Sequence, residues 1–474
     1  MNKIVKTAFL LLLACVCCWQ TKAASRSMDI FLQNGLTKNA NISVYVVNLT
    51  TGKVIESYRA DNLVPPASVM KLITTATALE ALGSDFRFPT VLEYSGSIEN
   101  GVLHGDLYIH GYGDPTLGSR NQNFLTSWVK AVQNAGIREI QGKIIADMSF
   151  FDGEACNPGW LCEDAANAYA PGIFSIAYMD NSLNIQLRSG PVGTTATVIR
   201  TAPEIPELTF ENHIRCTQTQ SDGAFVYGLP YQQVRYLTGS VPSNRGAFGI
   251  QGDIPNPGLL LAQHFTKALR ETNIRVKEEA SYIAEADRVS RTEFYTYRSE
   301  TLAQIVKRTN MRSVNLYAEM IFRYLGTKTS LPGTIQHSVD YIHSFWQNRA
   351  VDMAQAIIKD GCGLAPQDGV SAHTFVRLLQ YMNNSPESKA FYESLPVSGM
   401  SGTLKSLLAG TELEGKVHAK SGTISGTKNF AGYIEMPNGD RLAFAVLVNS
   451  AQGKARNIQP IIGKYLLDVY QNNK

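Results

Sequence analysis

The sequence predicts an α+β protein whose main domain contains one antiparallel sheet flanked by helices. Near the start of the chain, β-rich runs at 42–48 and 54–59 surround Gly52, which is typical of a hairpin. Three further β-rich runs lie near the end, at 416–423, 429–435 and 441–449. The last two are joined by a Pro-Asn-Gly-Asp turn, which is a strong hairpin signal. Runs at both ends of the chain, with helices between them, are most simply combined in one sheet.

A helix is predicted directly after the proline pair Pro65-Pro66. The prolines disfavour helical backbone before them, and the apolar run 72–82 that follows has helical spacing and ends at Gly83. The helix should therefore begin at or beside Ser68. Later helical patterns occupy residues 301–307, 315–325, 339–346, 372–382 and 460–470.

The stretch from residue 90 to residue 288 differs, because short strands and turn residues dominate it. The elements predicted there are strands at 103–110 and 143–147 and helices at 124–134 and 258–272. We therefore expect residues 25–89 and 289–474 to form one domain. One or more accessory domains are inserted into it at 90–288.

Residues 1–24 have the form of a secretory signal peptide. Two lysines precede a short apolar run, and small residues at 23–25 suit cleavage by a signal peptidase. The run Leu12-Leu13-Ala14-Cys15 also resembles a bacterial lipobox, in which Cys15 is lipidated. Either route predicts export, to the periplasm or the cell envelope. No later stretch is long and apolar enough to span a bilayer.

Charge and cysteine content narrow the classes of function. A formal net charge of +3 over 474 residues gives no sign of a nucleic-acid partner. Beyond the leader, Cys156 and Cys162 enclose a Pro-Gly turn and are the best disulfide pair, with free thiols as the alternative; the pairing of Cys216 stays open. No Cys/His cluster has zinc spacing, so neither a metal nor another cofactor is expected.

Ser68 and Lys71 have the spacing of a nucleophile and its base. Residues i and i+3 share one face of a helical turn, so the Lys71 amine can lie against the Ser68 hydroxyl. A lysine desolvated by apolar neighbours has a lowered pKa and can accept the hydroxyl proton. Ser-x-x-Lys also occurs at Ser127–Lys130 and Ser425–Lys428, and about two copies are expected by chance. Only the Ser68 copy stands at a proline-marked junction before an apolar helix.

Two further short motifs follow along the chain. Ser313-Val314-Asn315 stands where a loop meets a helix, and Lys420-Ser421-Gly422 ends a β-rich run. Each has a structural alternative: a helix cap for the first motif and an exposed strand lysine for the second. The order Ser-x-x-Lys, Ser-x-Asn, Lys-[Ser/Thr]-Gly is that of penicillin-binding proteins and serine β-lactamases.

With these motifs, the sequence resembles a low-molecular-mass class C penicillin-binding protein, a D-alanyl-D-alanine carboxypeptidase/endopeptidase of the penicillin-binding-protein-4 type. The resemblance covers nearly the whole mature chain and includes the segments 105–117, 159–164, 360–364 and 395–404. It implies a β-lactamase/transpeptidase-like domain with a large β-rich insertion between the first two motifs. Ser421 stands where the family usually has threonine, and Cys362 stands where it usually has serine.

The resemblance also implies roles for single residues. Ser68 forms the acyl-enzyme, Lys71 is its base, and Ser313 relays a proton to the leaving amine. The substrate-binding residues that it implies are Asn315, Lys420, Ser421, Gly422 and Thr423, with the N–H groups of Ser68 and Thr423 as the oxyanion hole. Asp164 and Tyr169 match the spacing of an acidic and an aromatic residue that contact the stem peptide in relatives; a surface loop is the alternative.

The resulting expectation is an exported serine-type D-Ala-D-Ala carboxypeptidase that also cuts D-alanyl–diaminopimelate cross-links. Its partners are peptidoglycan stem peptides ending in D-Ala-D-Ala, and β-lactam antibiotics as covalent inhibitors. A β-lactamase, or a catalytically silent peptidoglycan-binding protein, is the alternative. The sequence leaves the oligomeric state open.

Overall fold

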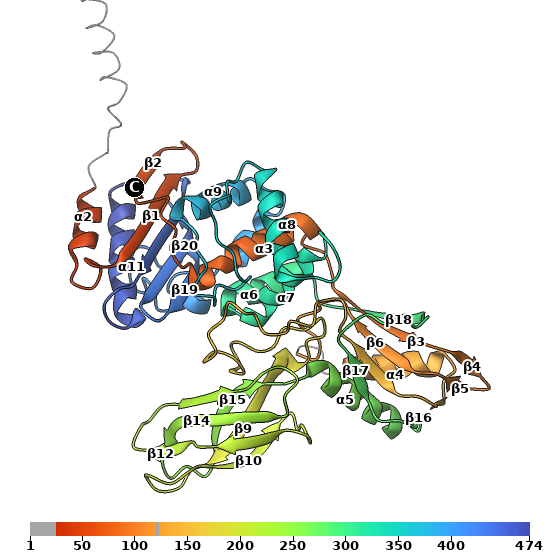
Figure 1. Cartoon of the computed structure of the whole chain (residues 1–474). Coiled ribbons are helices and arrows are strands. Elements are labelled where there is room, and N and C mark those ends of the chain that lie inside the picture. Colours follow the sequence, from red (N-terminus) through yellow and green to blue (C-terminus); the bar gives the residue numbers. More distant parts are fainter. Residues whose placement is uncertain (1–24, 120–122) are drawn as a thin grey trace, which may run out of the picture.

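The computed structural model describes residues 25–119 and 123–474. The predicted signal peptide, with Cys15, lies outside the described residues. The main domain is built on a five-stranded antiparallel sheet in which the first strands of the chain lie beside the last ones (Figure 1). In spatial order the strands are β19 (Val417–Ile424), β20 (Thr427–Glu435), β21 (Arg441–Asn449), β1 (Asn41–Asn48) and β2 (Val54–Tyr58). The prediction of one sheet from both ends of the chain is confirmed.

Helices cover both faces of this sheet, which explains why its central strand β21 is buried at every position after the first. On one face lie α2 (Arg26–Gln33) and α11 (Ala455–Gln471), which share a hydrophobic core with the sheet. A second core lies on the opposite face. The helices of that face are η1 (Ala67–Met70), α3 (Lys71–Leu82), α6 (Leu302–Arg312), α7 (Asn315–Gly326), α8 (Ile335–Gln347), α9 (Ala372–Asn383) and α10 (Ser388–Glu393).

The insertion extends away from the main domain as two units (Figure 1). The first contains two sheets and two helices: β17 (Ser281–Ile283), β8 (Ile144–Asp147), β6 (Leu107–Gly111), β3 (Pro89–Tyr94) and β18 (Thr292–Arg298); β16 (Arg275–Val276), β7 (Glu139–Ile140), β5 (Val102–His104) and β4 (Ser97–Glu99); α4 (Phe124–Asn134) and α5 (Pro257–Glu271). The second contains β10 (Thr197–Ala202), β9 (Ser182–Arg188) and β15 (Phe248–Asp253), beside β11 (Thr209–Asn212), β14 (Val234–Pro242), β12 (Arg215–Thr217) and β13 (Gly223–Tyr227).

The insertion differs from the predicted segment 90–288 in two respects. Its sheet continues beyond residue 288, because β18 pairs with β3. Conversely, part of the segment packs into the main domain, where Phe151, Trp160 and Ile173 belong to the same core as α3 and α7. Pairing and packing partners distant in sequence set both limits, so local composition does not mark them.

Three smaller predictions also need correction. The single strand expected at 103–110 is two strands, β5 and β6, in different sheets. Helix α11 begins at Ala455 and contains Pro460, which was expected to start it. Cys156 and Cys162 are free thiols rather than a disulfide, as are Cys216 and Cys362. None of the helices that the structure describes combines the length and the apolar character needed to cross a bilayer.

Candidate active site

Ser68 lies in the short helix η1, which continues directly into α3. The preceding loop is fastened to the sheet by Asn429 of β20. The side-chain amide of Asn429 donates a hydrogen bond to the Pro65 carbonyl (2.9 Å) and accepts one from the Val448 backbone N–H (2.8 Å). The prediction that a helix begins beside Ser68 is confirmed. The sheet therefore fixes the position of the loop that carries Ser68.

The Lys71 amine is completely buried beside Ser68. Its Nζ lies 3.0 Å from Ser68 Oγ, 2.6 Å from Asn315 Oδ1 and 2.8 Å from the Cys362 carbonyl oxygen. Burial lowers the pKa of this amine, while the nearby Cys362, Asp360 and Glu319 act in the opposite direction. The three neighbouring oxygens come from three separate parts of the chain, so only the fold assembles this environment.

Lys420 is also fully buried, so the alternative of an exposed strand lysine is wrong. Its Nζ donates hydrogen bonds to Ser313 Oγ (3.0 Å) and to the Ser421 carbonyl (2.6 Å). Ser313 has a left-handed backbone (φ 56°) at the end of α6, and this conformation turns its hydroxyl towards β19. Burial lowers the pKa of Lys420 strongly, and the positive charges of Lys71 and Lys428 lower it further. The buried amines of Lys71 and Lys420 therefore lie in the same candidate site.

Lys428 lies at this site as well, although only the Ser68 copy of Ser-x-x-Lys was predicted to be catalytic. It pairs with Thr423 across the β19–β20 hairpin, and its Nζ donates a hydrogen bond to Thr423 Oγ1 (3.0 Å). Thr403 was also missed as a site residue: its hydroxyl accepts a hydrogen bond from Ser421 Oγ (2.7 Å). A tight turn at residues 424–427 pairs Thr423 with Lys428, and recognising this turn in the sequence could have located Lys428.

Gly422 is the point at which strand β19 passes closest to the loop that carries Ser68. A Cβ atom at this position would lie 2.5 Å from the Pro66 carbonyl oxygen and 3.1 Å from the Ser68 backbone nitrogen. Real Cβ atoms essentially never come as close as the first distance. The glycine of the Lys-Ser-Gly motif is therefore required by close approach of two backbones.

Asn315 links the Ser68–Lys71 pair to the insertion. Its Oδ1 faces Lys71, and its Nδ2 donates a hydrogen bond to the Tyr169 carbonyl (2.9 Å). The Tyr169 hydroxyl in turn donates to Asp164 Oδ1 (2.8 Å), and the Tyr169 side chain is 46% exposed. The Tyr169 backbone thus contacts the candidate site through Asn315, while the Tyr169 side chain is exposed and its partner Asp164 is half-buried.

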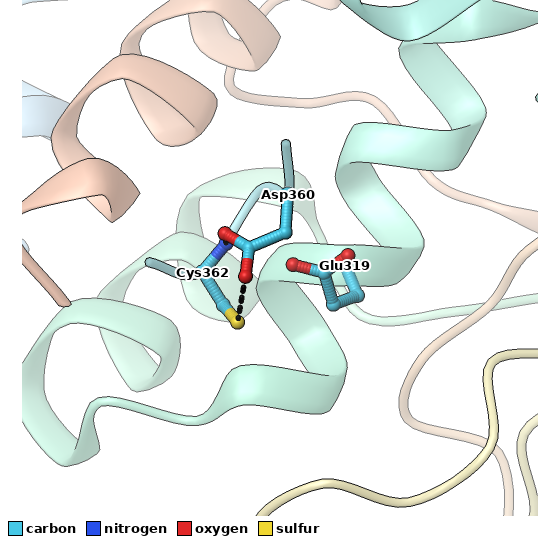
Figure 2. Close-up of side chains that lie close together, drawn as sticks. All are labelled: Glu319, Asp360 and Cys362. Carbon is cyan, nitrogen blue, oxygen red and sulfur yellow. Dashed lines mark hydrogen bonds between the residues drawn. The ribbon is translucent and has the colours of Figure 1, made fainter. Parts of the chain in front are cut away.

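Behind Lys71 lies a buried cluster of Glu319, Asp360 and Cys362 (Figure 2). Asp360 accepts hydrogen bonds from the backbone N–H groups of residues 362–365 and from the Trp160 indole. Burial and the nearby Asp360 raise the pKa of Glu319 to about 8, and burial raises that of the Cys362 thiol well above its usual range. The Glu319 carboxyl and the Cys362 thiol therefore release their protons less readily than usual, and the oxygens of Asp360 are occupied by N–H groups. These three side chains are therefore better suited to holding the loop at residues 360–365 than to binding a cation.

Comparison with known proteins agrees with this architecture. A model of the D-Ala-D-Ala carboxypeptidase 3 (S13) family matches residues 24–466. A D-alanyl-D-alanine carboxypeptidase from Actinomadura sp. (strain R39) is 30% identical over 443 residues, covering 90% of this chain and 81% of the relative. The crystal structure of penicillin binding protein 4 from Haemophilus influenzae superposes with a TM-score of 0.82 at 22% identity, covering 94% and 98% of the two chains. That protein complexed with a β-lactam gives a TM-score of 0.77, also at 22% identity, with 94% and 99% covered.

The fold and the Ser/Lys centre define a serine acyl-transfer enzyme of the penicillin-binding class. The chain belongs to the D-Ala-D-Ala carboxypeptidase 3 (S13) family. The predicted transpeptidase-like fold, the class C low-molecular-mass resemblance and the serine-type D-Ala-D-Ala carboxypeptidase activity are thereby confirmed.

The Gly422→Ala variant tests the close approach of β19 to the Ser68 loop. The added methyl group forces two backbones apart, and misplacement of about 1 Å can slow catalysis by roughly a hundredfold. We expect the rate constant for acylation by a fluorescent penicillin to fall between about tenfold and a hundredfold. Gly249→Ala is the matched control, because Gly249 also lies in a strand but has open space around it. An unchanged acylation rate in Gly422→Ala would contradict the steric argument.

Proposed function

We propose that Ser68 is the nucleophile of this carboxypeptidase and that Lys71, as the neutral amine, is its general base. One observation carries the proposal. A neutral amine has two N–H groups and one lone pair, and two of the three oxygens around Lys71 Nζ, from the Asn315 amide and the Cys362 peptide, can only accept. The N–H groups satisfy these two oxygens, so the lone pair faces the third, the Ser68 hydroxyl at 3.0 Å.

The reaction then follows from this geometry. As Ser68 Oγ bonds to the carbonyl carbon between the last two D-alanines, its proton passes to Lys71 Nζ. The C–N bond breaks as Ser313, whose hydroxyl lies 3.0 Å from Lys420 Nζ, gives its proton to the leaving D-alanine amine. The proton that Lys71 took from Ser68 restores the Ser313 hydroxyl and leaves Lys71 neutral again. Water hydrolyses the resulting ester and frees Ser68. The backbone N–H groups of Ser68 and Thr423 stabilise the oxyanion, a contribution typically worth several kcal/mol.

The terminal carboxylate of the substrate is held by the β19 end of the site. Lys420 and Lys428 supply positive charge there, and the hydroxyls of Ser421 and Thr423 supply hydrogen bonds. Ser421 replaces the usual threonine but keeps the hydroxyl. β-Lactams carry a free carboxylate beside a strained amide bond and so mimic the D-Ala-D-Ala end of the substrate, which is why these antibiotics acylate the same serine.

The test of this function measures two rates on the wild-type enzyme. We expect release of D-alanine from a pentapeptide ending in D-Ala-D-Ala, and a penicilloyl-enzyme that decays slowly. Rapid penicillin turnover without D-alanine release would instead indicate a β-lactamase. Cleavage of D-alanyl–diaminopimelate dimers in the same assay tests the endopeptidase activity.

We place the mature enzyme on peptidoglycan outside the cytoplasm. The mass of its N-terminal peptide distinguishes signal-peptide cleavage near residues 23–25 from lipidation of Cys15.

The Asp164→Ala variant tests whether the insertion binds the side chain of the stem peptide. Asp164 and Tyr169 are linked by a hydrogen bond on the loop that contacts Asn315, so a diaminopimelate amine can reach the carboxylate. We expect kcat/KM to fall about five- to tenfold for diaminopimelate peptides and to stay unchanged for peptides without that amine, since one exposed charged hydrogen bond is worth about 1 kcal/mol. Equal relative efficiencies on the two peptides would remove Asp164 from the substrate-binding set.

A further inference from the structure

The environment of Lys71 depends on one stretch of the insertion, residues 157–169. Apart from Ser68, two groups contact the Lys71 amine: the Asn315 side chain and the Cys362 carbonyl. Each of these groups is itself held by the 157–169 stretch, through different contacts. The accessory part of the chain thus reaches the general base along two separate routes.

The first route runs through Asp360. The Trp160 indole N–H donates a hydrogen bond to Asp360 Oδ2 (2.9 Å), and both side chains are buried. Asp360 also accepts from the backbone N–H of Cys362 (3.0 Å) and so fixes the turn whose carbonyl faces Lys71. Asn157 supports the same turn by donating its side-chain N–H to the Lys359 carbonyl (3.0 Å).

The second route runs through the backbone of Tyr169. Its carbonyl accepts the Nδ2 hydrogen of Asn315 (2.9 Å). This bond determines which end of the amide points towards Lys71, because an amide that donates from Nδ2 presents Oδ1 on the opposite side. The bond therefore selects the acceptor that the Lys71 amine needs.

We propose that segment 157–169 of the insertion is a positioning element for the general base Lys71, and that Trp160 is a positioning residue for the carboxypeptidase reaction. The inference rests on the role proposed above for Lys71. It explains why the Cys362 side chain can depart from the family's serine: the contact with Lys71 comes from the Cys362 backbone. It also gives the insertion a part in catalysis besides substrate contact.

The charged groups around Lys71 provide a second test, through the pH dependence of acylation. The titratable groups that face Lys71 are Asp360 and Cys362 on the turn, Glu319 on α7 and the Lys420 amine on β19. The Trp160 N–H partly neutralises Asp360, since a donated hydrogen bond stabilises a carboxylate. Without it, the field of Asp360 at Lys71 becomes more negative, the pKa of Lys71 rises, and the base is neutral only at higher pH.

The Trp160→Phe variant removes the indole N–H and keeps an aromatic ring in the core. We expect the limiting rate of Ser68 acylation by a fluorescent penicillin to fall roughly tenfold at pH 7, as expected for slight misplacement of a catalytic group. The dissociation constant of the preceding non-covalent complex should stay unchanged. The acid limb of the acylation rate against pH should move to higher pH.

Two other tryptophans provide matched controls. Trp346→Phe also loses a buried indole hydrogen bond in the main domain, to Thr77 Oγ1, and controls for lost stability. Trp128→Phe alters a buried indole in the core of the insertion, where the N–H has no hydrogen-bond partner. Melting temperatures of all three variants are measured alongside the rates.

The outcomes separate this inference from the proposed function. If Trp160→Phe matches the wild type, or if Trp346→Phe slows acylation equally with the same pH shift, the positioning role is overturned. Lys71→Met is measured in the same series. If it too acylates at the wild-type rate, the proposed base is wrong; if it is inactive while Trp160→Phe is normal, only the positioning role fails.

Discussion

Replacing Ser68 with alanine will abolish covalent labelling by a fluorescent penicillin and reduce D-alanine release by a factor on the order of 10⁶, as for other serine nucleophiles. The hydroxyl is the only group within hydrogen-bond distance of Lys71 Nζ, among the three described partners of that amine, that can donate a proton to it. Without it no ester forms. Labelling is read on a denaturing gel and D-alanine release by a coupled assay.

The chain provides a matched control for this variant. Ser127 has the same spacing to Lys130 as Ser68 has to Lys71, but it lies in α4 of the insertion and donates its hydroxyl proton to the Phe124 carbonyl (2.6 Å). Ser127→Ala should label and hydrolyse like the wild type. Equal labelling of Ser68→Ala and the wild type would remove Ser68 as the nucleophile.

Replacing Lys71 with methionine will lower the acylation rate constant by about 10³ to 10⁴, within the range lost with a general base. Methionine fills the buried volume without an amine. Lys71→Arg is the informative partner variant, because arginine keeps the positive charge but cannot be deprotonated in proteins. Both variants should be slow in stopped-flow acylation if proton acceptance matters. A fast Lys71→Arg enzyme would show that the charge alone is sufficient.

The pH dependence of the wild type follows from the same base. Burial lowers the pKa of Lys71 from its ordinary value of 10.5, so the neutral, active form is reached at lower pH than for an exposed lysine. Acylation should therefore rise with pH along an acid limb that lies below 10.5 and reach a plateau above the lowered pKa. The rate is measured at constant ionic strength across that range. A rate that falls as pH rises through this limb would contradict a neutral-lysine base.

The parts of this protein that the sequence determined are those carried by local pattern. Alternation and turn residues predicted the β1–β2 and β20–β21 hairpins, and the proline pair before an apolar run located the helix that carries Ser68. The i, i+3 spacing placed Lys71 beside Ser68, because both residues lie in one helical turn. Short motifs can be recognised in a sequence because the residues of each motif are close neighbours in the chain.

Other features were decided by the tertiary structure alone. Lys428 reaches the site through hairpin register, and Trp160 and Asp360 meet across 200 residues of chain. The limits of the insertion depend on where β18 finds a partner strand. The same holds for the burial of Lys420, whose motif reads equally well as an exposed strand end. Burial and long-range hydrogen bonds depend on what the rest of the chain places nearby, and that information is absent from any short stretch. The sequence therefore supplied the chemical groups, while their pKa shifts and orientation came from packing.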